Sequence, residues 1–78
     1  MNKQRRSTLR KISDRLGSIK DEIEAVMDEE QDAYDNLPDG IRESDNGERL
    51  ADNVSELQGV IDSLENDVID KIDSVAAS

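Results

Sequence analysis

The residues best suited to recognition chemistry lie close together in the middle of the chain. Tyr34 is the only aromatic residue and offers a ring on which a base could stack. Arg42 and Arg49 could bind phosphate, because a guanidinium group forms paired hydrogen bonds with phosphate oxygens. Asn36 and Ser44 supply further hydrogen-bonding groups. These five residues predict a site for a small anionic nucleotide, with the free backbone N–H groups of the following helix as an additional anion contact.

A structural role is the alternative for the same segment. Leu37 and Ile41 are apolar, so together with Tyr34 they could simply cover the end of a helical core. The residues from Asp35 onward superficially resemble a calcium-binding loop. However, Leu37 and Asn46 stand where such a loop requires an oxygen ligand and a bidentate glutamate. We therefore expect no metal site in this segment.

The composition excludes most catalytic chemistry. The 78 residues include no histidine and no cysteine. Zinc, haem and iron–sulfur sites built from these side chains, disulfides, and Ser–His or Cys–His nucleophile pairs are therefore impossible. Carboxylates are numerous, but acid–base catalysis also needs a water-excluding pocket, which nothing in so short a chain indicates. We expect a protein that is not an enzyme and that needs neither a metal nor a cofactor.

The charge is divided unevenly along the chain, whose net charge is −10. Residues 1–20 contain seven basic residues and one acidic residue, a net charge of +6. Residues 21–78 contain three basic and nineteen acidic residues, a net charge of −16. The basic end can attract an acidic region of the same molecule or of another copy. Direct nucleic-acid binding is not expected, because the acidic majority repels phosphate.

Acidic residues recur at intervals of three or four along one side of the first half of the chain. They are Asp21, Glu24, Asp28, Asp32 and Asp35. On a helix, residues at this spacing lie about 5–6 Å apart, which is close to the separation of phosphates in DNA. The row could imitate a nucleic acid and block a basic groove, or it could serve solubility alone.

Apolar residues follow a heptad pattern in both halves of the chain. The first series alternates steps of three and four residues: Leu9, Ile12, Leu16, Ile19, Ile23 and Val26. The second series contains one additional step of four near Val68, which is a stutter: Leu50, Val54, Leu57, Ile61, Leu64, Val68, Ile72 and Val75. Ser7 or Thr8 is expected to cap the first helix, and Asp45, followed by Glu48, the second.

These patterns predict a single all-α domain spanning residues 1–78. We expect a helix over about 7–34, a loop over about 35–46 containing Pro38 and Gly40, and a helix over about 47–76. The loop allows an antiparallel two-helix hairpin. Because two helices bury only a thin core, the hairpin is expected to oligomerise into a four-helix or larger bundle. No apolar run reaches the roughly 20 residues that span a bilayer, so we expect a cytoplasmic protein without membrane association.

One loop motif suggests a biological context. Tyr34-Asp35-Asn36-Leu37-Pro38, followed by Glu43-Ser44 and Gly47-Glu48, comes after a basic start and a first helix rich in Glu and Ile and before an acidic second helix. This layout resembles a family of short phage-encoded helical-hairpin proteins with an Asp-Asn-Leu-Pro loop. The resemblance implies a counter-defence protein that acts in the host cytoplasm by stoichiometric binding. It would sequester a nucleotide immune signal or block a host defence protein. An acidic DNA-mimic inhibitor and a structural coiled-coil assembly module are the alternatives.

Overall fold

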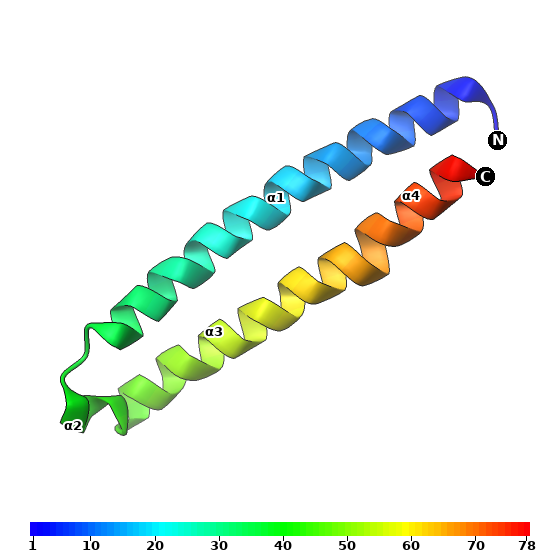
Figure 1. The fold of residues 1–78 in the computed structure, drawn as a ribbon. Coiled ribbons are helices and arrows are strands. Elements are labelled where there is room, and N and C mark those ends of the chain that lie inside the picture. Colours follow the sequence, from blue (N-terminus) through cyan, green and yellow to red (C-terminus); the bar gives the residue numbers. More distant parts are fainter.

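The computed structural model describes residues 1–78 and is helical throughout (Figure 1). Its elements are α1 (Lys3–Asp35), α2 (Asp39–Arg42), α3 (Asp45–Ser63), the π-helix η1 (Leu64–Ile69) and α4 (Asp70–Ala77). The last three elements follow one another without a break and form what we call the second arm, residues 45–77. There is no strand, so the predicted all-α class is confirmed.

Helix α1 and the second arm lie side by side and run in opposite directions, so that both termini lie at the same end of the molecule (Figure 1). Three polar contacts join the arms along their length: Arg6 Nη2 donates to the Ser78 carbonyl (2.6 Å), Lys20 Nζ lies 3.5 Å from Glu65 Oε2, and Asn53 Nδ2 donates to Glu30 Oε2 (3.1 Å). The result is an elongated molecule of 59 × 16 × 11 Å. None of its helices combines the length and apolar character that crossing a bilayer requires.

Both helix starts differ from the sequence prediction. Asn2, not Ser7 or Thr8, caps α1, because its Oδ1 accepts a hydrogen bond from the Arg5 amide at 2.8 Å. Asparagine is as good a cap as serine, so the helix begins at Lys3, earlier than expected.

The second arm begins at Asp45, the residue predicted to be its cap. Ser44 holds the capping position of α3, and Asp45 is the first helical residue. The Ser44 hydroxyl makes no capping bond and donates instead to the carbonyl of Ile41. Asp45 and Glu48 lie in the first turn, where negative charge favours the positive end of the helix dipole. The expected loop is also partly helical, since it contains α2.

The two arms meet along a seam that differs from the predicted one on α1. Leu9, Leu16 and Ile23 are half-buried, as expected. Ile19 and Val26, which were predicted to face the partner helix, remain 45% and 51% exposed. The prediction for these two residues is wrong. The heptad spacing correctly identified Leu9, Leu16 and Ile23 as the central line of the seam. It did not identify which residues beside this line face the second arm.

On the second arm, η1 absorbs the stutter. A π-turn accommodates one residue more than an α-turn. The least exposed apolar residues of the arm are Leu50, Val54, Leu57, Ile61, Leu64, Ile69, Ile72 and Ala76. The step from Leu64 to Ile69 is five residues, and it lies within η1. Val68 and Val75, which were predicted to lie in the seam, are therefore turned outward and are 39% and 48% exposed.

The core is thin. Only four of the 78 residues are buried: Ser13, Gly47, Ile61 and Ala76. A small domain without disulfides or a bound metal buries too little apolar surface for high stability by itself.

Candidate functional site

Tyr34 and Arg42, two of the predicted ligand-binding residues, lie together at the loop end. The guanidinium carbon of Arg42 is 6.0 Å from the centroid of the Tyr34 ring, within cation–π range. Arg42 Nη2 donates to the backbone carbonyl of Asp35 at 2.6 Å, and its Nη1 lies 3.5 Å from Asp39 Oδ1. The carbonyl of Asp35 is at the C-terminal end of α1, where helix carbonyls lack partners within the helix. Arg42 therefore fastens α2 to the end of α1.

Gly47 packs directly against the backbone of Arg42. It is buried, and a Cβ atom built on it would lie 2.1 Å from the Arg42 carbonyl oxygen. No side chain fits there, so glycine permits the close approach of α2 to the first turn of α3. The sequence prediction did not assign Gly47 a structural role. Its position in the first turn of a predicted helix, where glycine is unfavourable, was the signal for this role.

The other three predicted site residues do not join this pair. The hydroxyl of Ser44 is used by the carbonyl of Ile41. The side chains of Asn36 and Arg49 are exposed and make no hydrogen bond or ion pair within the protein. None of the surface hollows of the molecule is lined by any of the five residues. The structure thus shows one Tyr–Arg pair that stabilises the loop, without an enclosed pocket beside it.

One donor at this end remains unused. Arg42 Nε is buried from solvent and has no hydrogen-bond partner. A buried donor without a partner carries a cost in free energy.

The acidic row is largely open to solvent. Asp21, Asp28, Asp32 and Asp35 are exposed, whereas Glu24 is half-buried and lies 4.0 Å from Lys20. Asp21, Asp28 and Asp32 make no ion pair and no side-chain hydrogen bond. Their charges are therefore available to a partner.

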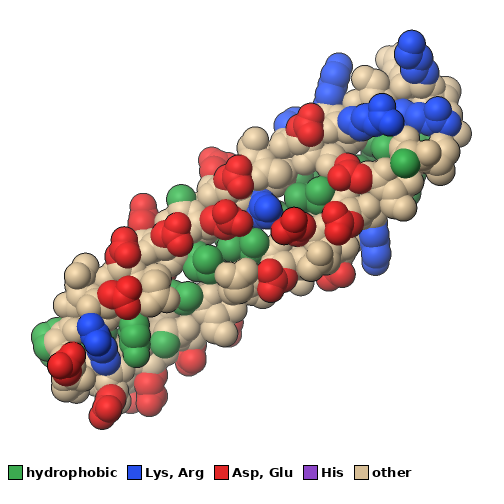
Figure 2. Space-filling view, viewed as in Figure 1, with side chains coloured by type: hydrophobic (Ala, Val, Ile, Leu, Met, Phe, Trp, Pro, Cys, Tyr) green, Lys and Arg blue, Asp and Glu red, His purple; other side chains and the backbone are tan.

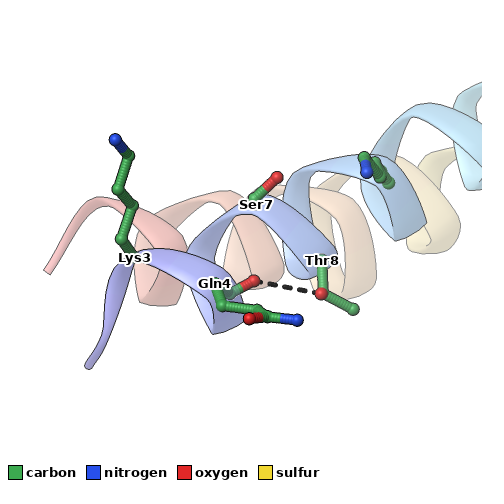
Figure 3. A pocket seen from close by; sticks show the side chains of 5 residues that line it. Lys3, Gln4, Ser7 and Thr8 are labelled. Atoms are coloured by element: carbon green, nitrogen blue, oxygen red, sulfur yellow. Dashed lines mark hydrogen bonds between the residues drawn. The ribbon is translucent and has the colours of Figure 1, made fainter.

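Basic side chains gather at the opposite end of the molecule, around the termini, while acidic ones follow the rest of both arms (Figure 2). A shallow hollow there is lined by Lys3, Gln4, Ser7, Thr8 and Lys11. Figure 3 shows that these side chains all come from the outside of one helix, with the Thr8 hydroxyl bonded to the Gln4 carbonyl at 3.0 Å. No apolar side chain lines the hollow, and two of its five lining residues are lysines, so this region is part of the basic surface.

The carboxylates do not form a metal site. No three of them are grouped so that they could hold an ion.

Comparison with protein families, with curated proteins and with solved structures finds no match for this chain.

Proposed function

We propose that this protein is a non-catalytic, counter-defence-type binding protein, a helical hairpin that assembles with itself and blocks a basic host protein stoichiometrically. The observation that carries the proposal is the set of unpaired, exposed carboxylates on α1, Asp21, Asp28 and Asp32. The resemblance of the loop motif to phage-encoded hairpin proteins supplies the counter-defence context.

The geometry of α1 suits a basic groove. This element is a single helix of 33 residues, about 50 Å long at 1.5 Å per residue, so the backbone that carries the carboxylates is ordered before binding. The backbone of α1 would therefore lose little conformational entropy on binding.

Pull-down from host lysate tests this proposal. A basic protein should be retained at low salt and lost at high salt, because interactions of exposed charges are screened. The triple variant Asp21→Asn/Asp28→Asn/Asp32→Asn should retain much less of it. A matched control, Asp52→Asn/Asp70→Asn/Asp73→Asn, removes the same charge from the second arm and should bind like the wild type. Equal retention by both variants, or no retained basic protein at low salt, would refute the proposal.

Sequestration of a nucleotide signal is the second candidate, and the exposed guanidinium group of Arg49, which makes no contact within the protein, favours it. A base would stack on Tyr34, and the exposed Arg49 would meet phosphate, with Asn36 and Ser44 as further contacts. Calorimetry with a panel of cyclic and adenosine-based nucleotides tests this form. Arg49→Ala should weaken binding without affecting the fold, since Arg49 makes no contact within the protein. The absence of heat with every nucleotide would exclude it.

A further inference from the structure

One long face of the molecule carries an uncovered apolar strip. On α1 the strip is a column of residues seven apart, of which Ile19, Val26 and Ala33 are exposed and Ile12 is half-buried. On the second arm it consists of Val60, Val68 and Val75. The step of eight between Val60 and Val68 contains the extra residue of η1. Val26 and Val60 line one shallow hollow, and Val60 and Val68 line the next, so both columns belong to the same face. We call these seven residues the apolar face.

A different and more polar column of α1 faces the second arm. Ser13, Lys20, Met27 and Tyr34 also recur every seven residues, and all are buried or half-buried. The fold of one chain thus turns Ser13 and Lys20 inward and leaves Ile19 and Val26 about half exposed. Exposed apolar area costs about 25 cal/mol per Å² relative to burial. Covering the apolar face would therefore be favourable.

We propose that a second copy of this chain covers the apolar face, with the two copies antiparallel, so that α1 lies along α1 of the partner. The two apolar faces would then form the centre of a four-helix bundle. On α1 this face runs from residue 12 to residue 33, about 32 Å at 1.5 Å per residue. This inference deepens the self-assembly part of the proposed function and rests on that part alone.

The residues that flank the apolar face select the antiparallel arrangement. Arg15 and Glu29 lie next to the α1 column, because each is three or four residues from one of its members. Glu56 and Lys71 border the column of the second arm in the same way. When the columns of two antiparallel copies are centred on each other, Arg15 meets the partner's Glu29 and Glu56 meets the partner's Lys71. Glu22, at the two-fold axis, meets the same residue of the partner.

The arrangement with the same ends together brings like charges into contact. Within one chain Lys20 pairs with Glu65 and Val26 lies opposite Val60, so Arg15 is level with Lys71 and Glu29 with Glu56. Placing α1 over the partner's second arm would set Arg15 against the partner's Lys71. It would likewise set Glu29 against the partner's Glu56. Such juxtapositions disfavour an interface.

Sedimentation equilibrium with the full chain tests the face. The wild type should be a dimer, and Val26→Asp/Val60→Asp should raise its dissociation constant at least about 100-fold, since both valines would be buried at the centre. The control Ser7→Asp/Ala51→Asp adds the same charge at exposed positions outside the apolar face and should remain dimeric. Circular dichroism verifies that each variant is helical. A dimer unaffected by Val26→Asp/Val60→Asp would overturn the inference.

Charge reversal tests the relative orientation of the two copies. It uses exposed residues, so it does not depend on whether the Val26→Asp/Val60→Asp variant folds. Arg15→Glu and Glu29→Arg should each weaken the dimer about threefold to tenfold, and the double variant should restore it. If the same ends lay together, Arg15→Glu would strengthen the dimer, because it would face the partner's Lys71. The native chain has no cysteine, so Glu22→Cys, at the axis, should form an intermolecular disulfide, whereas Thr8→Cys should not.

The outcomes separate this inference from the proposed function. A monomeric wild type at high concentration overturns both the dimer and the self-assembly part of the function. A dimer in which Glu22→Cys does not cross-link overturns only the antiparallel arrangement. Failure to bind any host protein, with the dimer intact, refutes the host-blocking function and leaves this inference standing.

Discussion

The loop end and the long arms are held together by different kinds of contact. At the loop end, Gly47 brings backbone against backbone, and Arg42 bonds a helix-terminal carbonyl while lying over Tyr34. Along the arms, half-buried apolar side chains and a few exposed polar pairs make the contacts. The loop end is therefore specified by unique positions. In the arms, no single contact is essential, so individual residues can be substituted. The arms also leave apolar surface exposed for a second copy.

The largest expected effect comes from Gly47→Ala. The new Cβ would overlap the Arg42 carbonyl oxygen, so α2 must move away from α3. We expect a loss of about 2–3 kcal/mol in the free energy of unfolding, as for other overpacked sites. Urea unfolding followed by circular dichroism at fixed protein concentration measures it. A stability equal to that of the wild type would show that the loop end is not specified by this contact.

Removing the arginine contacts gives the next largest effect. Arg42→Ala loses the bond to the Asp35 carbonyl and the contact with Tyr34. We expect a loss of about 1–2 kcal/mol, because a charged hydrogen bond and a cation–π contact disappear together. Arg49→Ala is the matched control, since Arg49 is exposed and free of such contacts. Equal destabilisation by both substitutions would contradict the special role of Arg42.

A glycine in the arms should behave oppositely to Gly47. A Cβ on Gly17 would meet nothing within 4 Å, and the residue lies inside α1. Gly17→Ala should therefore raise the free energy of unfolding by about 0.8–1 kcal/mol, the difference in helix propensity. The same urea experiment measures this gain. Destabilisation by Gly17→Ala would mean that the arms contain a close approach that the fold of one chain does not show.

The contrast between the regions also explains how far the sequence predicts the fold. The heptad spacing predicts two long helical segments and the central line of Leu9, Leu16 and Ile23, because periodicity reflects burial directly. It does not predict whether Ile19 or Lys20 faces the second arm. The apolar column of Ile19 and Val26 lies on one side of the central line and the more polar column of Lys20 and Met27 on the other, and packing decides between them. Apolar residues that are covered by a second copy have the same heptad spacing as apolar residues that are covered within one chain. The sequence pattern therefore does not distinguish the two.

The loop end was predictable only in part. Its location follows from Pro38 and Gly40, and Tyr34 and Arg42 were singled out by residue type. Their contact could not be foreseen, because it depends on α2, a helix of four residues with no periodicity to reveal it. The capping residues Asn2 and Ser44 were missed for a related reason. Several adjacent residues are acceptable caps, and the choice among them depends on where the neighbouring helix begins to pack.

The smallest expected effect concerns the polar contacts of the arms. Lys20 lies 3.5 Å from Glu65 and 4.0 Å from Glu24, and both glutamates remain substantially open to solvent. Ion pairs of this kind contribute little, so Lys20→Gln should lower the free energy of unfolding by no more than about 0.5 kcal/mol at low salt. The difference from the wild type should vanish at about 1 M salt, where the screening length falls to about 3 Å. Unfolding curves at both salt concentrations measure it. A large loss that persisted at high salt would mean that the arms, like the loop end, depend on a unique position. Specific contacts would then extend along the whole molecule instead of being concentrated where α2 meets the arms.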